Sequence, residues 1–326
     1  MRKCLVLVTC ACLLLSVLGV VRCFAVSSES QVNLLQVTTQ KCWDSCPTWY
    51  KDGKHVLIAS DRLGDSAIWK VPIDGGAVIQ VTAGAKDIYD LWPDINPKTG
   101  AIVFSSNRAG KTSQIFMVIP GKTGLTQITR VPNDATCPRW SPDGKMIAFC
   151  CPDKEGTSYI WIVNSDGSTL RQIVEGYQPC WSPDGRRVAF AKQTTIGKVK
   201  NWDIYTIGVD GTAMAQVTSD ESHEFQPDWS ADGMWLAYVS VKEKTISPKS
   251  LRDILKEMRS KRNYEIWIKN VGDPSPSSIQ ITSSTGTDIS PRWSPDGKRI
   301  IFASDRSGSL DIWCTSGSLP TSAPVK

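Results

Sequence analysis

A five-residue motif, Trp-Ser-Pro-Asp-Gly, recurs along this chain and limits its fold more than any other feature. Proline presets the second position of a type I turn, aspartate suits the third, and glycine accepts the left-handed conformation that follows. The motif therefore predicts a tight turn between two antiparallel strands, made once in each repeat. Full copies stand at 140–144, 181–185 and 293–297, looser copies at 49–53 and 229–233, and a degenerate copy at 95–100.

Three further pieces recur in step with the turn, and each is rich in β-branched or aromatic residues. An apolar run follows the turn, as at 146–149, an Ile-Trp-like run follows a polar loop, as at 159–161, and a Gln-Val-Thr-like run ends the unit, as at 172–174. With the Pro-x-Trp run, each unit has four short strands. Four strands per unit of about 40–50 residues are typical of a propeller blade, so six units predict an all-β, six-bladed β-propeller.

The two ends of the repeat region predict how the ring closes. The chain presents a Gln-Val-Thr run at 36–38 before any turn motif, and its last Ile-Trp run, 311–313, has no such run after it. The strand count balances if the first strand completes the sixth blade, which removes the open sheet edges of a linear array. We therefore expect one closed propeller over residues 34–315, followed by a disordered Ser/Pro/Thr-rich tail at 316–326.

The N-terminus has the pattern of a secretory signal. Arg2 and Lys3 precede an apolar run over 5–21, and Cys23-Phe24-Ala25 offers a small-x-small cleavage site. We expect residues 1–25 to be removed and the protein to be periplasmic or secreted. A retained membrane anchor and a lipid-modified N-terminus remain alternatives.

Charge and cysteine content exclude several function classes. Residues 242–262 carry eight basic and three acidic side chains, so the formal net charge of +5 hides a mildly acidic body. That balance argues against nucleic-acid binding over the propeller surface. Only His55 and His223 are present and there is no Cys-x-x-Cys pair, so we expect no metal and no cofactor. Cys42 and Cys46 are close enough to form a local disulfide, or are two buried thiols.

An insertion in the fifth repeat, at 241–263, predicts a basic helix. Ser247-Pro248 supplies a helix start, and an apolar stripe follows at the spacing i, i+3, i+4 and i+7. We consider that the stripe docks on the propeller, or that the helix contacts a partner or, peripherally, a membrane surface. A third hypothesis makes it a salt-sensitive lid over an acidic channel mouth. Its candidate contact residues are Arg252, Lys256 and Arg259.

An acidic slot recurs three positions before the proline of the Pro-x-Trp run. Because this slot leads into the innermost strand, six copies should ring one mouth of the central channel. One interpretation is a local turn cap, in which the carboxylate accepts backbone hydrogen bonds. The other is an acidic rim that attracts a basic segment or a cation. The candidate mouth residues are Asp44, Asp90, Glu224 and Asp288, together with His223 beside Glu224.

Catalytic signatures are missing from the sequence. It contains neither Gly-x-Ser-x-Gly nor His-Glu-x-x-His, and no catalytic residues can be assigned. We therefore expect a non-enzymatic, monomeric module that binds a protein or peptide at the channel mouth. The alternative is a ligand-, sugar- or cation-binding propeller, or an enzyme, that uses the same acidic mouth.

The combined pattern resembles a known repeat. Gln-[Val/Ile]-Thr, Pro-x-Trp-Ser-Pro-Asp-Gly, Ile-Ala-Phe, Ser-Asp-Arg-x-Gly and Asp-Ile-Trp are similar to the TolB-type, WD40-like repeat of six-bladed propellers. The resemblance covers about residues 34–315 and lacks the α/β domain that precedes the propeller in TolB. It implies an envelope module whose channel mouth binds a partner, with a Pal-like lipoprotein as one candidate. Prolyl-oligopeptidase-like and tricorn-like proteases share the repeat, so it indicates fold more strongly than function.

Overall fold

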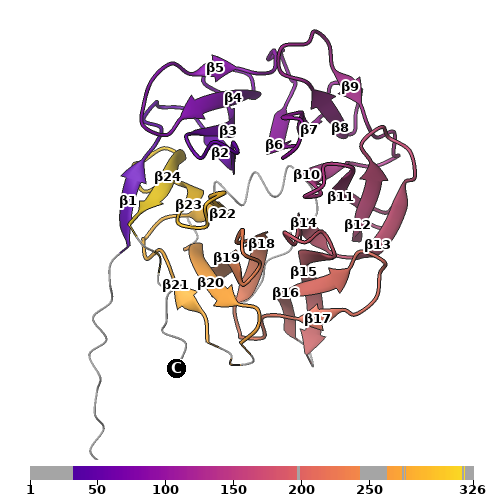
Figure 1. Cartoon of the computed structure of the whole chain (residues 1–326), viewed down its shortest axis with the longest axis vertical. Helices are drawn as coiled ribbons and strands as arrows, with labels where there is room; N and C mark the ends of the chain where they lie inside the picture. Colours follow the sequence, from indigo (N-terminus) through magenta and orange to yellow (C-terminus); the bar gives the residue numbers. More distant parts are fainter. Residues whose placement is uncertain are drawn as a thin grey trace, which may run out of the picture. The chain divides into compact units, whose positions relative to one another are not determined.

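The protein is a closed six-bladed β-propeller, as the sequence predicts. The computed structural model describes residues 32–196, 199–242, 263–273, 275, 277–317 and 319. These residues form six sheets of four antiparallel strands each, and they include no helix. Figure 1 shows the sheets arranged around a central channel, with the first strand of each blade innermost.

Blades one to five each use four consecutive strands. Their bounds in the first three blades are β2 (Asp44–Trp49), β3 (His55–Ser60), β4 (Ala67–Pro72) and β5 (Ile79–Gln80); β6 (Asp90–Ile95), β7 (Ile102–Ser106), β8 (Gln114–Val118) and β9 (Thr126–Gln127); β10 (Thr136–Trp140), β11 (Met146–Pro152), β12 (Ser158–Asn164) and β13 (Arg171–Glu175). Those in the next two are β14 (Tyr177–Trp181), β15 (Arg187–Ile196), β16 (Val199–Gly208) and β17 (Ala215–Gln216); β18 (His223–Trp229), β19 (Trp235–Val241), β20 (Glu265–Asn270) and β21 (Ile279–Gln280).

The sixth blade joins the two ends of the propeller. It comprises β22 (Asp288–Trp293), β23 (Ile300–Ser304) and β24 (Asp311–Ser316), and its outer strand is β1 (Asn33–Gln36). β1 pairs antiparallel with β24, with Leu34 opposite Thr315 and Gln36 opposite Trp313. The prediction that the N-terminal strand completes the last blade is confirmed (Figure 1).

The recurring turn motif has the role predicted for it. In the third blade the Asp143 carboxylate accepts hydrogen bonds from the Ser141 hydroxyl at 2.6 Å and the Lys145 N–H at 3.1 Å. Gly144 follows with a φ of 73°, in the left-handed region. The Ser141 hydrogen bond lowers the pKa of Asp143, so the charged carboxylate stabilises the turn.

The core lies between neighbouring sheets, where each second strand buries a large apolar side chain at the same position. Burying one such side chain stabilises the fold by about 1.5–3 kcal/mol, and the repetition distributes this contribution around the ring. The aromatic members of the set, none more than 1% exposed, are Phe104, Phe149, Phe190, Tyr238 and Phe302.

Two expectations lie outside the described residues, a third does so in part, and one feature was not expected. Of the predicted disordered tail at 316–326, the structure describes only 316, 317 and 319, where Ser316 ends β24 and Leu319 is buried. The signal at 1–25 falls on residues that the structure does not describe, as does the predicted helix of the 241–263 insertion with Arg252, Lys256 and Arg259. The unexpected feature is the length of β15 and β16. These strands stay paired from Arg187, opposite Gly208, to Ile196, opposite Val199. Within the part of the chain that the structure describes, no helix is long and apolar enough to span a membrane.

Candidate ligand site in the central channel

The acidic slot is occupied mainly by buried ion pairs. Asp90 is fully buried at the start of an innermost strand, and Arg108, eighteen residues later in the same blade, donates to its carboxylate at 2.7 Å. The Ser106 hydroxyl accepts from the Arg108 Nε at 2.9 Å and fixes the guanidinium. The same clamp recurs as Asp44–Arg62 and Asp288–Arg306, in the first and sixth blades.

The fifth blade fills this slot differently. Glu224 is fully buried and accepts a hydrogen bond from the Thr218 hydroxyl at 2.8 Å. Burial first, and then its hydrogen bond with Asp220, raise the pKa of Glu224 to about 10, so its carboxyl is neutral at pH 7. His223 is also buried, and its Nδ1 accepts from the Trp202 N–H at 3.3 Å.

These candidates occupy equivalent places in four separate blades. Each described ion pair of Asp44, Asp90 and Asp288 lies within its own blade. The clamps neutralise three of the predicted mouth residues, and protonation neutralises Glu224. This arrangement matches a local stabilising role more closely than an open acidic rim.

A different set of residues lines the upper opening, the end of the channel at which the innermost strands begin. In every blade the residue immediately before the strand proline has a positive φ, between 51° and 57°. Each lies at a register shift between the first and second strands, which is a β-bulge. Non-glycine residues rarely adopt this conformation, and strain of this kind is concentrated at functional sites. We call the set the pre-proline ring: Cys46, Trp92, Cys137, Gln178, Gln226 and Ser290.

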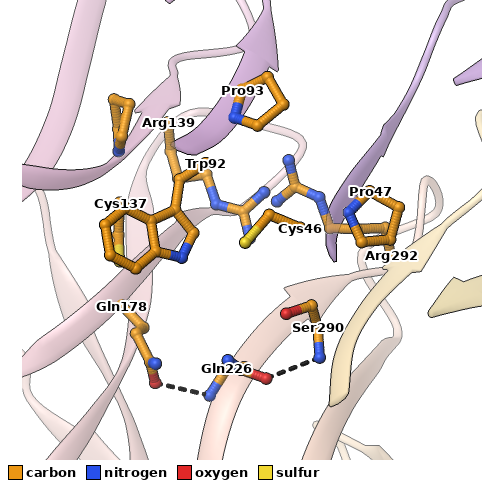
Figure 2. Close-up of a pocket in the computed structure, with 11 residues that line it drawn as sticks. Cys46, Pro47, Trp92, Pro93, Cys137, Arg139, Gln178, Gln226, Ser290 and Arg292 are labelled. Atoms are coloured by element: carbon orange, nitrogen blue, oxygen red, sulfur yellow. Dashed lines mark hydrogen bonds between the residues drawn. The ribbon is translucent and has the colours of Figure 1, made fainter. Parts of the chain in front are cut away.

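Side chains of the pre-proline ring hold the backbone of the next blade. The Gln178 amide oxygen accepts from the Gln226 N–H at 3.0 Å, and the Gln226 amide oxygen accepts from the Ser290 N–H at 2.6 Å (Figure 2). On the other side of the ring the backbone N–H of Trp92 lies near the Cys46 sulfur; burial raises the pKa of that thiol, and this N–H opposes the rise with a smaller effect. The ring is therefore preorganised by contacts that pass from blade to blade.

Four charged side chains narrow the channel below this ring. Arg292 donates to Asp94 at 2.6 Å and to Asp228 at 3.1 Å, while Arg139 lies 3.8 Å and 4.0 Å from the same two carboxylates. All four occupy the position after the strand proline, and we call them the charged layer. Figure 2 shows both guanidinium groups reaching into the upper opening.

Burial sets the protonation of the two acids in the charged layer. Desolvation raises the pKa of Asp228 to about 7, although the nearby Arg139 opposes the rise. The pKa of Asp94 is raised for the same reason. Asp94 and Asp228 also accept hydrogen bonds from the backbone N–H of Trp140 and Trp293, at 2.7 Å and 2.8 Å. They therefore link the channel to the strand ends of the following blades.

The lower opening, at which the innermost strands end, is lined by tryptophan. A cavity of about 260 Å³ lies there below the charged layer. The Trp49 and Trp181 indoles donate to the carbonyl oxygens of Arg292 and Arg139, each at 3.0 Å. We call this set the tryptophan ring: Trp49, Trp140, Trp181, Trp229 and Trp293.

Sequence reasoning missed both the pre-proline ring and the charged layer. A signal for the charged layer was present, because the residue after the strand proline is charged in four blades, as Asp94, Arg139, Asp228 and Arg292. Charge at one fixed position of an innermost strand indicates a channel-lining residue. Among the described residues no group of three or more His, Cys, Asp or Glu side chains has the arrangement of a metal site.

A closed ring of six TolB-type repeats with a narrowed, charged channel defines a β-propeller scaffold of the kind found in both binding proteins and hydrolases. The chain belongs to the family of the tricorn protease N-terminal β-propeller domain, which matches residues 114–318.

Two relatives match parts of this chain and carry different names. A TolB homologue of Chlorobium luteolum is 29% identical over 143 residues, 43% of this chain and 31% of that protein. YuxL, an uncharacterized peptidase of Bacillus subtilis, is 24% identical over 198 residues, 59% of this chain and 28% of that protein. The chain thus spans less than a third of the length of either relative.

A solved structure assigned as TolB, from Agrobacterium tumefaciens, shares the fold. Its TM-score is 0.63 at 16% sequence identity, and the match covers 88% of this chain and 97% of that one. At this level of identity the likeness concerns the fold alone.

Proposed function

We propose that this protein is an exported binding module that holds a segment of a partner polypeptide at the upper opening of its channel. The observation that carries the proposal is the pre-proline ring, in which six strained backbone positions present side chains of four kinds around one opening. Strain of about 1–3 kcal/mol per residue persists where the surrounding structure enforces it, as the blade-to-blade hydrogen bonds do here.

The chemistry of the opening favours binding over catalysis. Burial raises the pKa of the Cys46 thiol to about 12, so it is protonated and a poor nucleophile at neutral pH. The remaining groups of the ring are an indole, two amides, a hydroxyl and a second thiol. The indole of Trp92 offers a large contact area, and the amides of Gln178 and Gln226 can exchange hydrogen bonds with a peptide backbone.

The Asp–Arg clamps argue against the alternative function, in which an acidic rim holds a cation or a basic ligand. Arg62, Arg108 and Arg306 already neutralise the three aspartates, so a cation would have to displace a bound guanidinium. A periplasmic or secreted location, and an envelope lipoprotein as partner, follow from the predicted signal and from the TolB-type resemblance. Both belong to this proposal.

Peptide selection on the immobilised protein tests the proposal. Peptides enriched from a random display library should lose at least tenfold in affinity for Trp92→Ala, measured by calorimetry. Met234→Ala is the matched control, because Met234 is 53% exposed and lies in the turn that follows Trp229 at the opposite end of the strand. Peptides that bind both variants as tightly as the natural protein would place recognition elsewhere and refute the proposal.

A further inference from the structure

The two arginines of the charged layer occupy equivalent positions but have unequal hydrogen bonds. Reading the position after the strand proline around the ring, blades one to three carry Thr48, Asp94 and Arg139. Blades four to six carry Cys180, Asp228 and Arg292. The layer therefore repeats every three blades, and the two halves differ in one residue, threonine in the first and cysteine in the second.

Arg292 donates three side-chain hydrogen bonds in this arrangement. It donates to Asp228 and Asp94, and its Nη2 also donates to the Thr48 hydroxyl at 2.8 Å. Its side chain is 8% exposed. Thr48 in turn donates to Asp94 at 3.3 Å, so the hydroxyl bridges the arginine and the acid.

Arg139 lacks this support. Its guanidinium makes no side-chain hydrogen bond with another described residue, and its nearest carboxylate oxygens are 3.8 Å and 4.0 Å away. The residue that corresponds to Thr48 on this side is Cys180, whose thiol donates to Asp228 at 3.5 Å. A thiol sulfur is a weak acceptor, so it does not replace the threonine hydroxyl as a partner for the guanidinium.

The unsatisfied guanidinium faces the upper opening. Both arginines line the cavity beneath the pre-proline ring and also the cavity on the lower side, whereas Asp94 and Asp228 line only the lower one. Arg139 is 20% exposed, so it is partly desolvated and still reachable from the channel. Figure 2 shows its guanidinium directed into the opening between Cys46 and Pro93. A cation in this position, with planar donors to spare, is suited to a planar anion.

The space above Arg139 limits the size of that anion. The upper cavity measures about 40 Å³. Since a water-sized atom needs about 10–15 Å³, the cavity holds about three heavy atoms, as many as a carboxylate group contains. We infer that Arg139 binds a ligand carboxylate at the floor of the upper opening. The inference rests on the proposed function in one respect, that the ligand enters through the upper opening. It adds that the innermost end of this ligand carries a carboxylate.

Such a carboxylate could belong to a peptide C-terminus or to an acidic sugar, and matched probes distinguish the two sources. The peptide probe is a library-selected peptide made with a free carboxylate and with an amide terminus. The sugar probes are glucuronate and glucose. In calorimetry the carboxylate form of one pair should bind about tenfold or more tightly than its neutral form, since a charge-assisted bidentate hydrogen bond is among the strongest polar contacts.

Three variants test the role of Arg139. Arg139→Gln should abolish the preference for the carboxylate form. Cys180→Thr should weaken the preference at least threefold, because the new hydroxyl can accept a hydrogen bond from Arg139, as the Thr48 hydroxyl does from Arg292. Cys180→Val introduces a side chain with the shape of threonine but no hydroxyl acceptor, so it should leave the preference for the carboxylate form unchanged. Thermal melts check that each variant is folded. If Arg139→Gln does not fold, the comparison of Cys180→Thr with Cys180→Val decides the question.

The outcomes separate this inference from the proposed function. If peptides bind at the pre-proline ring with equal affinity for both termini, the carboxylate inference is wrong and the binding module stands. If no peptide binds but glucuronate binds through Arg139, the peptide function is wrong and the anion site stands. Equal binding of every probe to the natural protein and to Arg139→Gln would overturn the inference.

Discussion

The two openings of the channel are built from the same six strands but differ in how freely their residues vary. At the lower opening five of the six blades contribute tryptophan, and each of Trp49, Trp140, Trp181 and Trp293 is 6–7% exposed. At the upper opening the pre-proline position carries four residue types on a nearly constant backbone.

Because the blades share one architecture, they serve as an internal comparison. A residue that recurs in every copy satisfies a requirement of the blade itself, such as packing or turn formation. A position at which the backbone is constant and strained while the side chain varies is under a different requirement. The comparison therefore supports a structural role for the lower opening and the recognition role that we propose for the upper opening.

The strongest test removes one tryptophan from each opening. Trp181→Ala should lower the free energy of unfolding by about 3–5 kcal/mol, because it empties a buried site and leaves the Arg139 carbonyl without its indole donor. Trp92 is only half-buried, so Trp92→Ala should cost about 1 kcal/mol or less. Urea denaturation at pH 7 measures both. Equal losses of unfolding free energy in the two variants would contradict the proposed difference between the two openings.

The clamps offer a second test, at the upper end of the strands but away from the pre-proline ring. Asp90→Asn should cost about 2–3 kcal/mol, since it leaves the Arg108 guanidinium without its carboxylate while 21% of that side chain retains access to water. The double variant Asp90→Asn, Arg108→Met should recover part of the loss in a denaturation cycle. Strict additivity of the two single changes would contradict the ion-pair interpretation.

Glu224 sharpens the comparison because it occupies the same slot as Asp90 and has a strongly raised pKa. Its pKa is raised from 4.5 to about 10, so folding favours the neutral form, and this contribution is lost as pH rises from 4.5 toward 10. Glu224→Gln should match the natural protein near pH 5 and exceed its stability by about 1–3 kcal/mol at pH 8. Thermal unfolding across this range provides the measurement, and a variant that falls behind as pH rises would show that the carboxylate is paired.

The smallest effect concerns the hydrogen bonds within the pre-proline ring. Gln226→Ala removes the acceptor of the Ser290 N–H and should cost about 1 kcal/mol in urea denaturation. The same change should reduce the affinity of selected peptides more than tenfold. Glu221→Ala, at a position before β18 and outside the ring, is the control. A large loss of stability with unchanged affinity would reverse the roles assigned to the two openings.

The fold was predictable because each repeat contains the residues that determine its own turn and strands. Trp-Ser-Pro-Asp-Gly specifies a turn by local chemistry, and six copies specify the ring, since stacked blades need the same core residue at the same place. The closing pair of β1 and β24 followed from counting strands. The long β15–β16 hairpin did not follow, because nothing in the repeat pattern specifies how far a hairpin extends past the sheet.

The candidate site was only partly predictable, for a physical reason. The acidic slot was visible, but the partner of Asp90 is Arg108, which the sequence presents as part of a loop motif eighteen residues away. Whether a carboxylate is free or neutralised depends on such pairing, and pairing is a property of the folded blade. The positive φ of the pre-proline residues was equally hidden, because residues before proline normally adopt extended backbone.

The pairing of β1 with β24 also sets the time at which folding can finish. The Gln36 amide donates to the Asp311 carboxylate across 275 residues of chain. At a synthesis rate of about 5–20 residues per second, about 15–60 s separate the production of these two partners. Throughout that interval the sixth blade cannot be completed and the ring stays open. For a chain that we propose is exported, late closure leaves a long period in which the unclosed polypeptide can be threaded through a translocation pore.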